Sequence, residues 1–302
     1  MKTLRLLLAG AGLCAGLSSA SWTAAAEISC PTIARSLRAE LTQGRTAMEP
    51  EGSYAATFRE AAAALPRCSA EEGVFYILLR SAELGGGKFP LQLGETKLAD
   101  LRAAAEMAVQ QHPRSVRIAT VWARTLGTIA AAQSAVTLDP ADAPAQVALG
   151  QAQLRSGNAT AAQATLEKVP TLSLLPGGQV ALARARLATG NLAGAVQAAQ
   201  AELRTDPWKA LEPVSRTIRE QTLQEATEIE GIARLAQGHT LAAARLLLAA
   251  AEGGRVAARV KLETLSKDEK TQAELAKLLH DQRLPRQQRT LLHALLMEGH
   301  KQ

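Results

Sequence analysis

Aromatic residues are scarce in this chain of 302 residues: Phe, Trp and Tyr together make up 3% of it. A core built on large rings is therefore excluded for most of the chain, and the abundant Ala and Leu favour thin, closely packed helices. Five of the aromatic residues fall between Tyr54 and Phe89, so this segment is expected to have its own bulkier core. Core packing is the favoured role of these rings, ahead of a ligand-binding cage.

Long apolar runs are absent beyond the N-terminus, so no second segment is expected to span a bilayer. The N-terminus combines the basic Lys2 and Arg5 with an apolar run at 6–17 and three small residues at 24–26. Residues 1–26 are therefore predicted to be a cleaved secretory signal peptide. A periplasmic or secreted location follows for the mature chain. Lipidation of Cys14 is the less favoured alternative, because it requires a small residue where Leu13 stands.

Cysteine occurs only three times, and no C-x-x-C pair is present. Nothing therefore marks a cysteine as redox-active. Cys14 would leave with the signal peptide, so Cys30 and Cys68 remain. Two cysteines in an exported chain predict one disulfide, Cys30–Cys68; the alternative is two buried free thiols.

Catalytic and cofactor motifs are also lacking. The loop at Gly85–Lys88 does not complete a phosphate-binding motif, because residue 82 is Ala and Phe89 stands in place of the required hydroxyl residue. The five histidines include no i, i+4 pair of the kind that binds zinc, and Ser53 lacks the second Gly of a nucleophile elbow. We therefore expect no catalytic residue, no metal site and no cofactor.

What the chain does contain is a repeat. The pairs Gly157-Asn158 and Gly190-Asn191 stand 33 residues apart, and they hold the only two asparagines of the sequence. A small residue precedes each turn glycine by seven positions, an alanine follows it by five, and a weaker third copy keeps this spacing. The residues that share the pattern are Gly150, Gly157 and Ala162, then Ala183, Gly190 and Ala195, then Gly231, Gly238 and Ala243. Small residues let two helices approach closely, and glycine at positive φ allows the chain to turn into the next helix, a conformation that asparagine also tolerates.

This pattern resembles the tetratricopeptide repeat (TPR) family, in which a small residue, a Gly-Asn or Gly-Asp turn, an alanine and a closing proline recur. The resemblance covers roughly residues 141–251, and Pro207 lies where the second copy should close. Two features depart from the family: Pro170 comes early in the first copy, and the usual aromatic residues are replaced by Ala, Val and Leu. The resemblance implies an all-α fold, a right-handed α-solenoid of stacked antiparallel helix hairpins. The alternative is a plain Ala-rich helical bundle.

Four parts are predicted along the chain. After the signal peptide, an N-terminal helical cap covers 27–94, the TPR-like array covers 95–254 and C-terminal capping helices cover 255–302. The best repeats are expected at 141–175, 176–208 and 223–252. Gly190 and Gly238 are 48 residues apart, about 14 more than one repeat, so 208–221 is predicted to be an additional helix or a long connection. A capping box at Ser266–Glu269 is predicted to open a helix.

In the family, the first helix of each repeat lines a concave groove, and this resemblance implies the partner-binding residues here. They are Val147, Gln151, Arg155, Val180, Arg184, Glu228 and Ile232, with Ala188 and Ala236 at the remaining equivalent positions. Arg155 and Arg184 would form a basic spot beside an apolar floor, which favours an acidic or C-terminal peptide segment; solvated surface arginines are the alternative. Both asparagines are committed to turns, so the family's carboxylate clamp of Asn and Lys is disfavoured.

The predicted function follows from fold resemblance and from the missing catalytic motifs. We expect a non-enzymatic, exported scaffold that binds envelope proteins in a bacterial secretion, motility, pilus or outer-membrane assembly machine. Two alternatives remain open: an enzyme or accessory subunit acting on envelope polymers, with its site in the N-terminal segment, and a small-ligand binder. The formal net charge of +6 is compatible with anionic partners, although nucleic acid is not expected because no binding module is recognisable.

Overall fold

Helices make up all the regular structure in the described part of the chain. The computed structural model describes residues 29–43, 50–84, 98–207 and 216–299. In these ranges there are fifteen α-helices, one short 3₁₀ helix and no strand, which confirms the predicted all-α class. The helices are α1 (Cys30–Gln43), α2 (Pro50–Cys68), α3 (Glu72–Leu84), α5 (Leu98–Gln111), α6 (Val116–Leu126), α7 (Ile129–Leu138), α8 (Ala143–Arg155), α9 (Ala159–Glu167), η2 (Leu172–Leu174), α10 (Gly178–Ala188), α11 (Leu192–Thr205), α13 (Arg216–Ala236), α14 (Thr240–Glu252), α15 (Val256–Leu265), α16 (Glu269–Leu279) and α17 (Arg286–Gly299).

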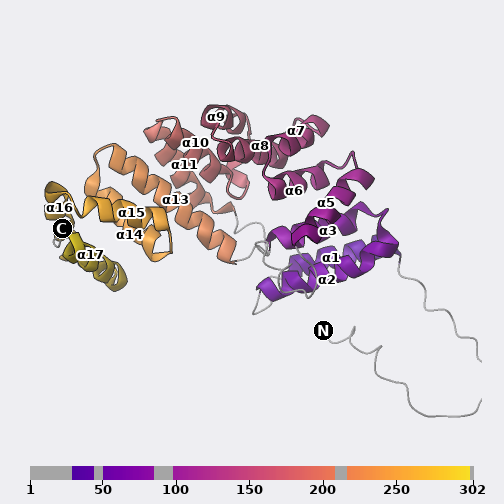
Figure 1. Ribbon diagram of the computed structural model, residues 1–302, viewed down its shortest axis with the longest axis horizontal. Coiled ribbons are helices and arrows are strands. Elements are labelled where there is room, and N and C mark those ends of the chain that lie inside the picture. Colours follow the sequence, from indigo (N-terminus) through magenta and orange to yellow (C-terminus); the bar gives the residue numbers. More distant parts are fainter. Residues whose placement is uncertain (1–28, 44–49, 85–97, 208–215, 300–302) are drawn as a thin grey trace, which may run out of the picture.

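The helices follow one another in chain order along an arc (Figure 1), from α1–α3 at one end to α16 and α17 at the other. Most helices contact the next helix in the chain, and many also contact the one after it. Five helices form a continuous row in this way, because α3 contacts α6, α6 contacts α8, α8 contacts α10 and α10 contacts α13. We call these five helices the inner row, and they carry the candidate site.

The turn glycines adopt the conformation that the repeat requires. Gly157, Gly190 and Gly238 have φ values of 83°, 81° and 83°, which confirms the three predicted turns. The asparagines have a different role, because Asn158 and Asn191 have negative φ and are the N-cap residues of α9 and α11. Their side chains accept hydrogen bonds from backbone amides three residues on, at 3.1 and 3.0 Å. The Gly-Asn pair therefore combines a left-handed turn with a cap for the next helix.

The small residues before the turns mark close helix contacts. A Cβ added at Gly150 of α8 would lie 2.6 Å from Leu166 Cγ of α9, and one added at Gly231 of α13 would lie 3.0 Å from Leu247 Cγ of α14. In the second copy, Ala183 stands at the glycine position and Ala199 at the leucine position, and both are fully buried. A larger residue on one helix is thus matched by a smaller one on its neighbour, which explains how the copies differ in sequence at the same place in the fold.

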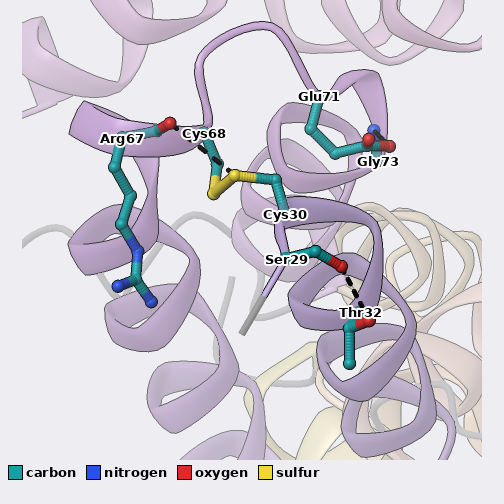
Figure 2. Close-up of a disulfide and its surroundings, with 7 residues drawn as sticks. All are labelled: Ser29, Cys30, Thr32, Arg67, Cys68, Glu71 and Gly73. Atoms are coloured by element: carbon teal, nitrogen blue, oxygen red, sulfur yellow. Dashed lines mark hydrogen bonds between the residues drawn. A yellow bond between two sulfur atoms is a disulfide. The ribbon is translucent and has the colours of Figure 1, made fainter. Parts of the chain in front are cut away.

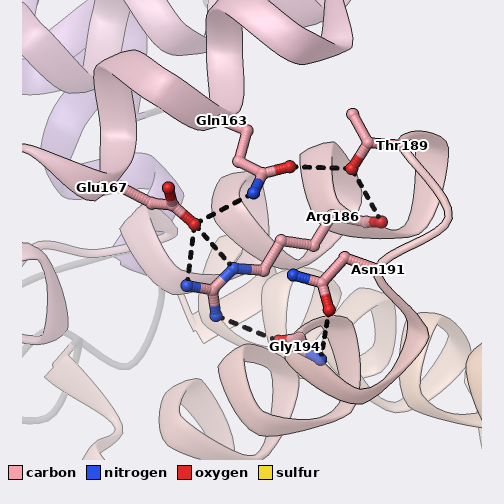
Figure 3. A network of polar contacts seen from close by, with 6 residues as sticks. All are labelled: Gln163, Glu167, Arg186, Thr189, Asn191 and Gly194. Carbon is pink, nitrogen blue, oxygen red and sulfur yellow. Dashed lines mark hydrogen bonds and ion pairs between the residues drawn. The ribbon is translucent and has the colours of Figure 1, made fainter.

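Polar contacts join neighbouring repeat copies near these turns (Figure 3). Arg186 of α10 reaches Glu167 of α9, with its Nη2 3.0 Å and its Nε 3.2 Å from Oε1, while its Nη1 lies 3.2 Å from the Gly194 carbonyl of α11. Gln163 donates to the same Glu167 oxygen at 3.1 Å and accepts from the Thr189 hydroxyl at 2.7 Å. One half-buried guanidinium therefore connects three successive helices.

The N-terminal helices have a bulkier core, as predicted from the aromatic cluster. Tyr54, Phe58 and Phe75 are buried in it, and Trp122 of α6 packs against it. The predicted disulfide is confirmed: Cys30 at the start of α1 is bonded to Cys68 at the end of α2, with a Cα–Cα distance of 5.4 Å (Figure 2). The bond closes a loop over a sequence separation of 38 residues, so it restrains α1 against α2.

The helix predicted to follow Ser266–Glu269 is confirmed, but the predicted capping box is wrong. Helix α16 begins at Glu269 and is capped by Asp268, whose carboxylate accepts a hydrogen bond from the backbone amide of Thr271 at 2.9 Å. Ser266 is instead the residue after the last turn of α15. Asp is as good an N-cap as Ser, and the two candidate caps lie only two positions apart, so the serine pattern was misleading.

Part of the predicted excess at 208–221 lies in α13. Residues 216–221 form the first turns of this 21-residue helix, so they extend a repeat helix at its N-terminus. The remaining residues, 208–215, lie outside the described part of the chain. The same holds for the predicted signal peptide at 1–26 and for the Gly85–Lys88 loop.

Candidate functional site

A pocket of about 690 Å³ lies along the inner row. Each of the five helices of the inner row contributes side chains to the pocket lining. The connection before α10 contributes Leu175, Pro176 and Gly177. The lining combines aliphatic and charged side chains. Its apolar residues include Val121, Pro144, Val147, Leu154, Leu175 and Val180, and its charged residues are Arg80, Glu83, Arg117, Arg124, Asp142, Arg155, Arg184 and Glu225. Five arginines face three carboxylates, so we call this site the basic pocket.

Most of the residues expected in the groove meet in this pocket. Val147, Gln151 and Arg155 follow one another at intervals of four on α8, and Val180 and Arg184 do the same on α10. Residues four apart share one face of a helix, and these two faces line the basic pocket side by side. Ala188 of α10 and Ala236 of α13 occupy the remaining equivalent positions. Both are exposed and lie outside the pocket lining.

Glu228 and Ile232 do not line the basic pocket. Glu228 is 3% exposed, and its Oε2 accepts a hydrogen bond from Arg255 Nε at 2.7 Å, so it belongs to an internal ion pair. Ile232 packs against the core formed by α14–α17. Helix α13 reaches the pocket through Thr222 and Glu225 instead. Thr222 and Glu225 lie six and three positions before Glu228, toward the N-terminal extension of α13 that belongs to the predicted excess at 208–221.

One ion-pair group in the pocket centres on Glu83 of α3. Its Oε1 lies 2.9 Å from Arg124 Nε of α6, and it also pairs with Arg80 one turn before it. Burial alone would raise the pKa of Glu83, but the charges of Arg124 and Arg80 outweigh it and lower that pKa. Sequence reasoning missed this group, because Glu83 and Arg124 are 41 positions apart and neither belongs to the repeat pattern.

A second ion-pair group connects α10 with α13. Arg184 pairs with Glu225, and the other carboxylate oxygen of Glu225 lies 4.0 Å from Arg255 Nη1. The charge of Arg184 is therefore offset within the protein. The expected basic spot of Arg155 and Arg184 consequently consists of one arginine with an intramolecular ion pair and one without such a partner in the described ranges.

The pocket offers no set of residues for bond-breaking chemistry among the described residues. No Ser, Cys or His lines the pocket. Asp142 caps α8, because its carboxylate accepts a hydrogen bond from the Ala145 amide at 2.8 Å. Glu83 is paired with Arg80 and Arg124, and Glu225 is paired with Arg184 and Arg255. Within the described ranges, no three His, Cys, Asp or Glu residues are placed to hold a metal ion. The arrangement is suited to binding.

The N-terminal segment was the expected place for an enzyme site. A hollow of about 260 Å³ lies between α1 and α3 there, and it is lined by Arg35, Arg38 and Glu71 among others. The carboxyl group with a raised pKa in this segment is that of Glu40, at about 7, and the causes are burial and then a hydrogen bond and charge repulsion with Glu60. Glu40 does not line the hollow, so the cleft and the unusual acid do not form one site.

The described helices give no indication of a membrane span, since none has both the length and the apolar character that crossing a bilayer needs. Known protein-family models give no match to this chain, and no curated protein sequence matches it.

Proposed function

We propose that this chain is a non-enzymatic scaffold that holds a segment of a partner protein in the basic pocket. In this proposal the inner row is one wall of a right-handed, TPR-like α-solenoid of antiparallel hairpins. The helix contacts in chain order and the left-handed glycine turns support the proposed architecture. The bacterial cell envelope, reached through the predicted signal peptide, is the proposed location, and the Cys30–Cys68 disulfide is compatible with it.

The observation that carries the proposal is the composition of the basic pocket. Its walls come from five helices, and they combine an aliphatic floor with fixed charges and no catalytic set among the described residues. Extended peptides bind well to such surfaces, because aliphatic side chains gain burial while the charges select orientation and sequence.

Site-specific photo-crosslinking tests this function. A benzophenone amino acid replaces Gln151, which lines the pocket, or Lys267, which is exposed between α15 and α16. In cells that make the protein, irradiation should give a discrete crosslinked partner from position 151 and none of the same mass from position 267. Equal labelling from both positions, or none from 151 with folded protein, would reject the groove as the partner site.

A small-ligand binder is the second candidate, and one observation favours it. The pocket volume of about 690 Å³ falls within the range of sites for drug-sized molecules, roughly 300–1,000 Å³. Mass spectrometry of the purified protein under native conditions distinguishes the candidates, since a retained small molecule adds a fixed small mass, whereas a retained partner protein adds the mass of a whole polypeptide.

A further inference from the structure

Arg155 differs from the other arginines of the basic pocket in its charge balance. Arg117 pairs with Glu72, and its Nη2 lies 3.0 Å from Oε1; Arg80 and Arg124 share Glu83, and Arg184 has Glu225. Arg155 makes no ion pair with the described residues, and its Nε donates to a neutral acceptor, the Gly127 carbonyl, at 3.3 Å. Arg155 is thus the pocket arginine that has no carboxylate partner in the described part of the protein.

The surroundings of Arg155 disfavour its positive charge. Its pKa lies below the ordinary value for arginine, first because it is partly buried and second because Arg184 is close by. A carboxylate placed between the two guanidinium groups would relieve this repulsion. It would also supply the charge-assisted hydrogen bonds that a neutral carbonyl cannot.

Gly127 lies next to the Arg155 guanidinium. This glycine ends α6 with φ 69°, and a Cβ added there would lie 2.8 Å from Arg155 Nε and 3.0 Å from Cζ. The guanidinium therefore lies directly against the glycine backbone, in space that any other residue would occupy.

The same pocket has an aliphatic floor. Val147, Leu154 and Val180 supply apolar contacts in the same pocket.

We propose that Arg155 anchors a carboxylate of the bound partner segment, whose adjoining aliphatic portion packs on Val147 and Val180. The carboxylate is a chain terminus or an acidic side chain of the partner. This inference rests on the proposed scaffold function and deepens it, because it identifies which of the two expected arginines recognises the ligand and which chemical group is recognised.

Hexanoate and hexanamide provide a minimal test, because both have the aliphatic chain and only hexanoate has the carboxylate. The disulfide-intact chain is titrated with each compound, and the guanidinium N–H signals are followed by NMR. Hexanoate should shift the signal that Arg155→Gln removes, in a saturable manner, and hexanamide should not. Equal effects of the two compounds, or no saturable shift with hexanoate, would overturn the proposal.

Arg259→Gln is the charge-matched control, because it also removes one positive charge, but from an exposed arginine outside the pocket lining that pairs with Glu263. Arg155→Gln should weaken hexanoate binding by about tenfold or more, as expected for loss of a charge-assisted hydrogen bond. Arg259→Gln should weaken it by less than about threefold, the scale of a screened, exposed charge. Similar weakening by both variants would mean a general electrostatic effect and would contradict the anchor.

Partner crosslinking from position 151 separates this inference from the proposed function. Loss of the crosslink in Arg155→Gln, with retention in Arg259→Gln, supports both. A crosslink that survives Arg155→Gln preserves the scaffold function and removes the carboxylate anchor. If hexanoate binds through Arg155 but wild-type protein crosslinks to no partner, the scaffold function fails, and a carboxylate carried by a partner protein is rejected with it.

Discussion

The carboxylate of Glu202 accepts a hydrogen bond from the backbone amide of Gly177, with 3.0 Å between Oε1 and N. Gly177 is the N-cap residue of α10 at φ 71° and has no side chain with which to cap its own helix. Glu202 belongs to the next helix, α11, and is fully buried. The start of one pocket-forming helix is therefore capped by a side chain of its neighbour, which couples the position of α10 to that of α11.

Glu202→Ala should destabilise the protein by about 2–4 kcal/mol, because it leaves amides at the start of α10 without an acceptor and creates a cavity. Burial raises the pKa of Glu202 even though the amides of Gly177, Val180 and Gln179 lower it, so the negative charge is costly at this position. Glu202→Gln, which keeps an acceptor oxygen, should therefore cost clearly less than Glu202→Ala. Urea unfolding measures both, and equal losses would contradict the capping role.

The disulfide should account for a large part of the stability of the N-terminal helices. Closing a loop with a sequence separation of 38 residues stabilises by about 4 kcal/mol in the chain-entropy treatment. The double variant Cys30→Ala, Cys68→Ala should therefore lower the urea midpoint of the N-terminal core, followed by near-UV circular dichroism of Tyr54 and Trp122. Reducing agent should lower the midpoint of wild-type protein similarly and leave that of the double variant unchanged, whereas an unaltered wild-type midpoint would show that the bond contributes little.

The helix ends could be predicted from sequence because they depend on local chemistry. Gly157, Gly190 and Gly238 need no distant partner to adopt positive φ, and the asparagine that follows two of them caps the next helix by itself. The disulfide could also be predicted from the sequence, since only one pairing of cysteines remains after the signal peptide is removed. The capping box failed at the same local level, because Asp268 competes with Ser266 two positions away.

The charge balance of the pocket could not be predicted in this way. Arg184 and Glu225 are 41 residues apart, and Arg155 lies 28 residues from the Gly127 carbonyl that it contacts. These distances close only after the inner row has assembled, and the extended α13 shifts which of its residues reach the pocket. The repeat pattern therefore located Val147, Gln151 and Val180 well, but it could not distinguish Arg155 from Arg184.

The turn glycines give a prediction about backbone strain alone. Nothing lies within 4 Å of a Cβ added at Gly190, which has φ 81°, so the Cβ of Gly190→Val contacts no other part of the protein. It should still destabilise by about 1–2 kcal/mol, because a β-branched residue disfavours this conformation. Thermal unfolding checks the change, with Ala188→Val, an exposed position of α10, as the control for helix propensity. If Gly190→Val lowers the stability no more than Ala188→Val does, the predicted backbone strain at Gly190 is contradicted.

Glu40 should make stability fall as pH rises. Its pKa in the folded protein is raised from 4.5 to about 7, so the folded state holds a proton that the unfolded state has lost between these values. The stabilisation that comes from this raised pKa is fully present below about pH 4.5 and is lost as pH rises to about 7. The free energy of unfolding should fall over this range by at most about 1.4 kcal/mol per pH unit. Urea midpoints between pH 4.5 and 7.5 should therefore decline less in Glu40→Gln than in wild-type protein.

Glu167→Gln is the control for this titration. The pKa of Glu167 is lowered by its hydrogen bonds with Arg186 and Gln163, so its contribution is present above the ordinary pKa and is lost only as pH falls below it. Between pH 4.5 and 7.5 its substitution should displace the stability profile without changing its slope. Parallel profiles for wild-type protein and Glu40→Gln would show that the Glu40 and Glu60 carboxyl groups do not share a proton in solution.

The match between small and large residues at the helix contacts predicts a compensating pair. Gly150→Ala places a Cβ 2.6 Å from Leu166 Cγ and should destabilise by about 1–3 kcal/mol through overpacking. Leu166→Ala removes a fully buried side chain and should cost about 2–5 kcal/mol. The double variant reproduces the Ala183 and Ala199 combination of the second copy, so its cost should be smaller than the sum of the two single costs.

A double-mutant cycle in urea measures this compensation. The expected coupling is about 1–2 kcal/mol in the favourable direction, within the range for residues in direct contact. If the costs of the two single substitutions add within about 0.5 kcal/mol, then the strain caused by Gly150→Ala does not depend on Leu166.

Ala183→Gly is the converse test. It opens space beside Ala199, which is too small to fill it, so it should destabilise the protein through the loss of packing and the lower helix propensity of glycine. A stabilising effect of Ala183→Gly would show that the alanine pair is already overpacked, and the rule of matched sizes would then fail in the second copy.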